Sequence, residues 1–357
     1  MGHLVSQSRE IVFISECVYG GFSPFVKNTI DRSVPSLLPF FATREDGMMH
    51  HRTRTENRPV FRALFYGDAI QDDERMNAAK IVAANAINYH ARSHSVSFFK
   101  SYDEITAGDL EADGNREYSI PTVRVQAHGI ESSGKKAGPM KIALINGSPK
   151  KGKNNSAYFA EELEKKLPPD TTCVPVRINT PGITREQLDV LAGSDALVFF
   201  FPLYADAFPS HLLSALITAE EYFNSLPPNR PRPRVYAAVN NGFYEGIQNI
   251  LVLDMLRFWC AKTGLPWGSG IGIGTGEMLG DLPSVPAGYG PKKTMGKLLD
   301  GLAASIIDGK DTANNFGAAD FPRFAFTFMA NLGWKQQARQ NKLRTRDIYK
   351  KPSPEKM

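Results

Sequence analysis

The segment from residue 141 to residue 167 constrains the fold more than any other part of the chain. Residues 141–146 read KIALIN, a short apolar run typical of a buried parallel strand. The loop GSPKKGKNNS follows at residues 147–156, and residues 157–167 carry an apolar stripe at helical spacing. A strand, a small-residue loop and a helix in this order predict an α/β unit built on a parallel sheet.

The alternation of strands and helices continues after this unit. Further strands are predicted at residues 172–178, 195–201, 235–239 and 271–273, separated by helical stretches such as 248–262. Strands that alternate with helices in this way predict a doubly wound, five-stranded parallel sheet with helices on both faces.

Two segments near the N-terminus match later ones in the same order. When the sequence is shifted by 185 positions, Tyr19 falls on Tyr204 and Pro24 falls on Pro209. At a second offset, residues 60–67 (VFRALFYG) match residues 235–242 (VYAAVNNG). The sequence therefore predicts a partial second copy of the fold that starts at its third strand and lacks the loop of residues 147–156.

These patterns predict four parts. They are a partial α/β domain at 1–105, a linker at 106–139, a complete domain at 140–311 and an aromatic C-terminal extension at 312–357. A sheet that lacks its first two strands has an open edge, which other segments usually cover. The candidates are the alternating segment 120–126 (IPTVRVQ), the main domain or a second chain.

Composition excludes several classes of protein. The 357 residues are 42% hydrophobic and 22% charged, which is typical of globular domains and not of disordered or fibrous chains. No apolar run reaches the roughly 18 to 20 residues of a membrane span, and the N-terminus lacks the pattern of a secretory signal. Three scattered cysteines and a net charge of +5 predict a cytoplasmic protein without disulfides, metal, nucleic-acid partner or membrane partner.

The loop of residues 147–156 has the chemistry of a phosphate site. Backbone N–H groups and the helix dipole favour an anion at such a loop, although the pattern is not that of a nucleoside triphosphatase. The candidate side chains are the donors Ser148, Asn155 and Ser156 and the cation Lys150. The alternative is an ordinary turn followed by a capped helix.

Two more loops follow the third and fourth strands of the same sheet. The candidates are Pro202, Leu203 and Tyr204 in the first loop and Asn241, Gly242 and Phe243 in the second. Each loop alone could be a strand end with a core tyrosine, or the start of a helix. Because ligands bind at the carboxyl edge of such sheets, the three loops together suit a phosphorylated flat heterocycle.

These three loops resemble those of the flavodoxin-like NADPH-dependent FMN reductase family, over about residues 140–311. The resemblance implies FMN bound non-covalently, its phosphate on the first loop and its isoalloxazine ring against the other two. It also implies an NAD(P)H oxidoreductase whose chemistry takes place on the flavin, without a catalytic side chain. The electron acceptor would be a quinone, nitroaromatic compound, flavin or metal ion, and the protein would be a homodimer.

Two alternatives remain open. A flavodoxin-type electron carrier would bind FMN but accept electrons from a protein, and an interaction module would keep the fold without the flavin. Four other features have simple structural interpretations. Residues 268–276 are expected to form a glycine-rich strand and turn, and His50-His51 a surface or interface pair. Cys17 and Cys260 are expected to lie in apolar surroundings, and residues 335–351 to form a solvated helix face.

Overall fold

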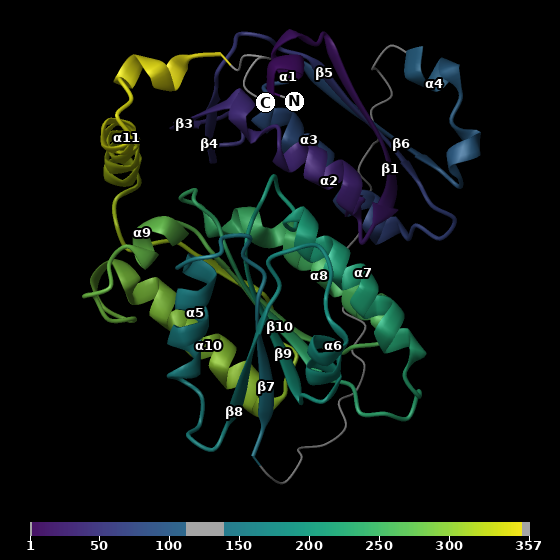
Figure 1. Ribbon diagram of the computed structural model, residues 1–357, viewed down its shortest axis with the longest axis vertical. Helices are drawn as coiled ribbons and strands as arrows, with labels where there is room; N and C mark the ends of the chain where they lie inside the picture. Colours follow the sequence, from purple (N-terminus) through teal and green to yellow (C-terminus); the bar gives the residue numbers. More distant parts are fainter. Residues whose placement is uncertain (1, 112–138, 352–357) are drawn as a thin grey trace. The chain divides into compact units, whose positions relative to one another are not determined.

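The computed structural model describes residues 2–111 and 139–351, which form two compact units (Figure 1). One unit contains residues 2–111 together with 321–351, and the other contains residues 139–320. Most of the expected linker, including residues 120–126, lies outside the described residues.

The second unit is built on a parallel sheet of six strands. They are β7 (Lys141–Asn146), β8 (Thr172–Arg177), β9 (Ala196–Pro202), β10 (Arg234–Asn240), β11 (Trp267–Ile273) and β12 (Asn315–Gly317). The order across the sheet is β8-β7-β9-β10-β11-β12. The first five strands follow the order 2-1-3-4-5, which is consistent with a flavodoxin-like fold. The expected count of five strands was wrong, because the short β12 adds a sixth at the edge beside β11.

Helices cover both faces of this sheet (Figure 1). They are α5 (Asn155–Glu164), α6 (Arg185–Ala192), α7 (Ser210–Ser225), α8 (Ile250–Thr263), α9 (Gly276–Gly280) and α10 (Lys293–Asp308), with 3-10 turns at Gly246–Asn249 and Gly290–Lys292. Helix α5 packs with α10, whereas α7 packs with α6 and α8. Every residue of β10 is buried, as expected of a central strand covered on both faces.

Strand β11 confirms the interpretation of residues 268–276 as a glycine-rich strand and turn. A Cβ atom on Gly268 would lie 2.3 Å from the Tyr236 ring, and one on Gly274 would lie 2.1 Å from the carbonyl oxygen of Tyr244. Only glycine permits backbone and side chains to approach this closely.

The first unit contains a four-stranded sheet in the order β2-β1-β5-β6 and a separate antiparallel pair, β3 and β4. The strands are β1 (Glu10–Val18), β2 (Gly21–Phe22), β3 (Leu37–Thr43), β4 (Met49–Thr53), β5 (Val60–Tyr66) and β6 (Ser93–Phe99). The helices are α1 (Gly2–Gln7), α2 (Pro24–Asp31), α3 (Asp72–Asn88) and α4 (Ala107–Glu111), with 3-10 turns at Val34–Ser36 and Tyr102–Glu104.

The two sheets share a structural repeat. Strands β1, β5 and β6 are parallel neighbours in the same order as β9, β10 and β11. A tight turn with two left-handed residues follows the first strand of each set: Tyr19 and Gly20 in one, Ala205 and Asp206 in the other. The turns therefore align Tyr19 with Ala205, one residue away from the Tyr19–Tyr204 match that the sequence indicated.

The outer edge of β1 is paired over a short length. Within the described residues, β2 pairs with β1 only at Cys17 and Val18. No described strand pairs with the rest of that edge, from Glu10 to Glu16. The expectation that another segment or chain covers this edge stays a prediction.

The aromatic C-terminal segment divides between the two units. Its start forms β12 in the second unit, and α11 (Arg323–Gln340) packs on β3 in the first, followed by a 3-10 turn at Thr345–Tyr349. The Phe41 N–H donates to Asn331 Oδ1 at 2.9 Å, and the rings of Phe41 and Phe326 stack with centroids 6.1 Å apart. Helix α11 is thus an integral part of the first unit.

Candidate functional site

The three loops singled out in the sequence meet at one edge of the six-stranded sheet. Strand β9 lies between β7 and β10, and the three strands end close together. Asn146, the last residue of β7, pairs with Phe200, two residues before the end of β9, and Asn240 pairs with Pro202, which are the last residues of β10 and β9. Because the strands are parallel, the loops that follow them emerge side by side (Figure 1).

Two asparagines shape the loop after β7. Asn146 Oδ1 accepts from the Ser148 N–H at 3.0 Å, and Asn146 Nδ2 donates to Asn154 Oδ1 at 3.2 Å. Asn154 is the N-cap of α5, because its Oδ1 also accepts from the Ala157 N–H at 3.0 Å. Asn155 and Ser156 are therefore the first two residues of the helix, where backbone N–H groups lack an acceptor within the helix.

The predicted phosphate-binding side chains differ in burial. Ser148 is 3% exposed and Ser156 is 2% exposed. The Lys150 side chain is 61% exposed, and its Nζ lies 4.0 Å from Glu277 Oε1. The two hydroxyls are thus fixed in the protein, whereas the cation stands in solvent beside a carboxylate.

Arg177, at the end of β8, was not among the expected site residues. Its Nη2 donates to the carbonyl oxygen of Lys150 at 2.6 Å and also to that of Lys151. These bonds tie the middle of the loop to the neighbouring strand. Gly147 fixes the start of the loop, since a Cβ there would lie 2.6 Å from a methyl carbon of Leu212.

A strained turn follows β9. The backbones of Tyr204 and Ala207 exchange hydrogen bonds of 3.1 and 3.0 Å, and the residues between them, Ala205 and Asp206, have φ angles of 41° and 60°. Non-glycine residues rarely adopt this left-handed conformation, and such strain clusters at functional sites. The Leu203 N–H donates to the Asn240 carbonyl at 2.8 Å, which ties the turn to β10. Pro202, Leu203 and Tyr204 are all partly exposed at this edge.

Asn240 connects the third loop to the first. Its Nδ2 donates to Ser156 Oγ at 3.2 Å and to the Phe201 carbonyl at 3.1 Å. Because Ser156 accepts this bond, its hydroxyl proton stays available to a further acceptor. Sequence reasoning noted Asn240 as part of its loop but did not predict this bridge.

Asn241 is held by its backbone and by one end of its side chain. Its N–H donates to the Ile273 carbonyl at 3.0 Å, and its Nδ2 donates to the Glu245 carbonyl at 3.1 Å. Its Oδ1 is buried and has no hydrogen-bond partner among the residues that the structure describes. An unpaired buried acceptor is costly, so a donor from a ligand would be favourable there.

The glycine that follows leaves room on this side of the site. Among the described residues, and apart from Gly242 and its two neighbours in the chain, no atom lies within 4 Å of the position that a Cβ on Gly242 would occupy. The φ angle of Gly242 is not positive, so no left-handed conformation requires glycine here. Phe243 and Tyr244 continue the loop and are partly exposed.

A fourth loop, which was not among the three expected from the sequence, also contributes to the site. It begins after β11 with Thr275, at a φ of 57°, and continues into α9. The Gly276 N–H donates to the Asn241 carbonyl at 2.8 Å, and a Cβ on Gly280 would lie 2.2 Å from Asn155 Oδ1. This loop therefore packs against both the ring-binding and the phosphate-binding candidates.

A buried lysine, Lys292, holds helix α5 in place through Tyr158. Lys292 Nζ donates to Tyr158 Oη at 2.7 Å and to the Leu282 carbonyl at 2.6 Å. Burial lowers the pKa of Lys292 and raises the pKa of Tyr158 to about 12, so the phenol stays protonated at neutral pH. The contact has a positioning role, since it fixes the helix whose N-terminus faces the site.

The sequence predicted a surface or interface pair at His50-His51; the surface alternative is wrong for His50, which is buried, and the interface alternative stays a prediction. His50 is 4% exposed and contacts Asp46 at 2.7 Å and Asn88 at 2.9 Å, while the His51 ring lies 5.0 Å from that of Phe41. Cys17 and Cys260 are buried and unbridged, as expected, and burial raises the pKa of Cys260. Among residues 2–111 and 139–351, no three His, Cys, Asp or Glu side chains cluster to hold a metal.

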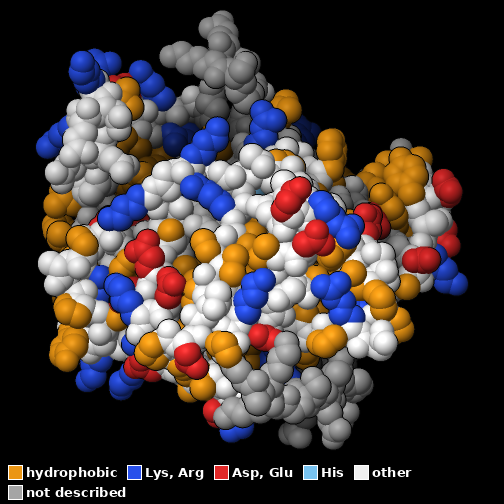
Figure 2. All heavy atoms as spheres, turned by 60° about the horizontal axis from the view of Figure 1, so that its bottom comes forward, with side chains coloured by type: hydrophobic (Ala, Val, Ile, Leu, Met, Phe, Trp, Pro, Cys, Tyr) orange, Lys and Arg blue, Asp and Glu red, His pale blue; other side chains and the backbone are white. Residues whose placement is uncertain are grey.

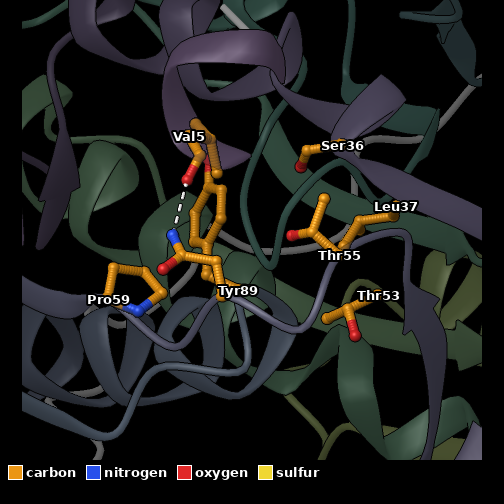
Figure 3. Close-up of a pocket in the computed structure, with 8 residues that line it drawn as sticks. Val5, Ser36, Leu37, Thr53, Thr55, Pro59 and Tyr89 are labelled. Carbon is orange, nitrogen blue, oxygen red and sulfur yellow. Dashed lines mark hydrogen bonds between the residues drawn. The ribbon is translucent and has the colours of Figure 1, made fainter. Parts of the chain in front are cut away.

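Two hollows lie in the first unit. One is about 10 Å³ in volume, enough for about one water, and it is lined by Val5, Ser36, Leu37, Thr53, Thr55, Asn57, Pro59 and Tyr89 (Figure 3). The other is an open hollow of about 490 Å³ that includes Arg54. That guanidinium already donates to four carbonyl oxygens, those of Pro35, Leu37, Ile348 and Lys350, so its donors are used within the protein.

No protein-family profile matches the chain, and no curated protein matches it. Among solved structures, 13 chains match. One of them is described as "Crystal Structure of azoreductase AzrA"; it is 14% identical, with a TM-score of 0.29, and the match covers 47% of this chain and 99% of that one. Similarity this low defines neither a family nor an activity for this chain. No helix in the described part of the chain is long and apolar enough to cross a bilayer.

Proposed function

We propose that residues 139–320 bind FMN non-covalently and that the protein is an FMN-dependent NAD(P)H oxidoreductase. One observation carries the proposal. The buried hydroxyls of Ser148, in the loop after β7, and of Ser156, at the N-terminus of α5, share a sheet edge with the unpaired Oδ1 of Asn241. The first group of atoms suits a phosphate, and the second suits an N–H on the rim of a flat ring.

The residues of the chain would then have distinct tasks. Ser148, Asn155, Ser156 and the first N–H groups of α5 would bind the phosphate, and Lys150 would offset its charge from the solvent side. The ring would lie against Pro202, Leu203 and Tyr204 and against the loop of residues 241–243. The bound flavin would supply the redox chemistry, accepting hydride from NAD(P)H and passing electrons to a small acceptor.

The acceptor class belongs to the same proposal. Quinones, nitroaromatic compounds, flavins and metal ions can all accept electrons from a reduced flavin. The partly exposed residues Leu203, Tyr204 and Phe243 provide an apolar border that suits flat organic acceptors.

The experiment that tests the proposal begins with the absorbance spectrum of the purified protein. Bound FMN should give the two visible bands of an oxidised flavin, and adding NADPH or NADH under anaerobic stopped-flow conditions should bleach them. A flavin that only a protein donor reduces would indicate an electron carrier. A chain that neither contains nor takes up FMN would overturn the proposal.

A further inference from the structure

Helix α11 has apolar side chains on two opposite faces. One face packs on β3 through Phe326, and Asn331 bonds to the same strand from the edge of that face. The opposite face exposes large apolar side chains: Phe324 by 79%, Phe328 by 68%, Met329 by 58% and Leu332 by 48%. We call these four residues the apolar face of α11. Three of them, at spacings of four, form one row along the helix.

Helix α11 and the residues that follow it carry a concentrated net positive charge. Residues 323–351 contain eight Lys or Arg residues and one acidic residue, Asp347, which gives 8 − 1 = +7. Since the whole chain has a net charge of +5, all other residues together sum to 5 − 7 = −2. On the face shown in Figure 2, acidic and basic side chains are interspersed. The concentration of charge in residues 323–351 is therefore a local feature.

The basic residues continue the row of the apolar face. Lys335 and Arg339 follow Leu332 by three and seven positions, so they lie on the same side of α11. Both are exposed. One side of the helix thus presents apolar side chains along its first turns and cations along its last turns.

We propose that this side of α11 docks on an anionic lipid bilayer, with the helix lying in the interface. A bilayer surface offers both a hydrocarbon boundary for Phe324 and Phe328 and anionic headgroups for Lys335 and Arg339. A symmetric dimer through this face would bring two segments of charge +7 together, which is unfavourable. Nucleic acid would use the cations but would leave the apolar row unburied. The docking is peripheral and independent of flavin binding, and it differs from the sequence-based expectation of no membrane partner.

Vesicle flotation of the full-length protein tests the proposal. The protein should float with vesicles of equimolar phosphatidylcholine and phosphatidylserine and remain unbound with phosphatidylcholine alone. Binding should weaken as salt is raised, because the headgroup attraction is screened. The double variant Phe324→Ser, Phe328→Ser should lower the partition coefficient at least about tenfold. Lys335→Gln with Arg339→Gln should also lower it at least about tenfold.

Matched control variants keep the test specific. Tyr289→Ser removes an apolar side chain that is 69% exposed in the other unit, and Lys293→Gln with Lys297→Gln neutralises two exposed cations at the same spacing on α10. Both should bind vesicles as the wild type does. Circular dichroism should show all variants folded, because every substituted side chain is exposed.

Three results would overturn the proposal. The first is absence of binding to the anionic vesicles, and the second is equal binding to both kinds of vesicle. The third is a dimer in light scattering that the Phe324→Ser, Phe328→Ser variant dissociates, which would assign the face to a second copy. Binding to duplex DNA that the same variant leaves unchanged, without vesicle binding, would assign the cations to nucleic acid.

Discussion

We expect the residues of the candidate site to contribute unequally to the affinity for FMN. Ser156 is buried and hydrogen-bonded to Asn240, whereas Lys150 is largely in solvent. We therefore expect Ser156 to contribute more than Lys150, because solvent screens an exposed charge.

The double variant Ser156→Ala, Lys150→Ala should weaken FMN binding much more than riboflavin binding, since riboflavin has no phosphate. Each lost charge-assisted hydrogen bond is worth about 1.5 to 3 kcal/mol. Fluorescence titration of the apoprotein with both ligands measures the difference. Lys153→Ala, which changes an exposed lysine of the same loop, is the control. An equal loss for FMN and riboflavin would place the phosphate elsewhere.

His51 should make the stability of the first unit depend on pH. Burial, with a smaller contribution from the nearby His50, lowers the pKa of His51 to about 4 from its ordinary 6.5. Between these values the unfolded chain binds more protons than the folded one. The free energy of unfolding should therefore fall as pH falls from about 6.5 to about 4, by up to about 3 kcal/mol.

Urea unfolding of the wild type and of His51→Phe across this range measures the effect. Phenylalanine keeps a ring against Phe41 but cannot take up a proton. The variant should lose stability less steeply as pH falls. Parallel pH profiles for the two proteins would show that His51 is not the titrating group.

At this scale, residue type and position predicted part of the site. Ser148, Asn155 and Ser156 could be proposed because they follow a strand and open a helix. The roles of Asn146, Asn154 and Asn240 could not be predicted, because they depend on which atoms lie within about 3 Å in the folded chain. Asn154 had one available signal, since asparagine is a common N-cap before a helical stripe.

The secondary-structure elements were predicted best where they are buried. The strand at 141–146 has the expected bounds. Strand β8 differs from its expected range by one residue at its C-terminal end, and β9 and β10 differ by one residue at both ends. Continuous apolar runs bounded by loops are strong signals of central strands. The hairpin of β3 and β4 was missed, since β3 contains a proline and β4 reads MHHRT, and three residues of β12 give no pattern.

The cap of α5 should couple helix stability to cofactor binding. Asn154→Ala removes the side chain that accepts from Ala157 and bonds to Asn146, so it should cost about 1 kcal/mol of stability and also weaken FMN binding. Thr184→Ala removes the corresponding cap of α6, which is not part of the three loops, and is the matched control. It should cost a similar amount of stability and leave FMN affinity unchanged. The same affinity in both variants would show that Asn154 does not shape the site.

At the scale of the whole molecule, we expect one FMN per chain. The described part of the first unit repeats the strands that correspond to β9, β10 and β11, and it has no strand-loop-helix element like that of residues 141–164. FMN released by heat, quantified by absorbance against protein concentration, measures the stoichiometry. A value near two per chain would contradict a single site in residues 140–311.

A homodimer remains a prediction, and the C-terminal segment provides its test. Truncation after Asn314 would remove β12 from the edge of β11 and α11 from β3, so it should expose apolar surface and impair solubility. Light scattering and gel filtration of the full chain and the truncated chain measure both properties. A soluble, active and monomeric truncated chain would contradict this expectation.

The return of the chain to its first unit has a mechanical consequence. The second unit is continuous in sequence and is inserted between α4 and α11, two elements of the first unit. A pull applied to the C-terminal end is therefore resisted first by the bonds of Arg54 to the carbonyl oxygens of Ile348 and Lys350, and then by the contacts of α11 with β3, including the Asn331 side chain and the Phe326 ring. An enzyme that unfolds the protein by pulling on this end must detach α11 from the first unit before the force reaches the second unit and its candidate flavin site. The contacts of α11 would therefore determine how much force the second unit is protected from.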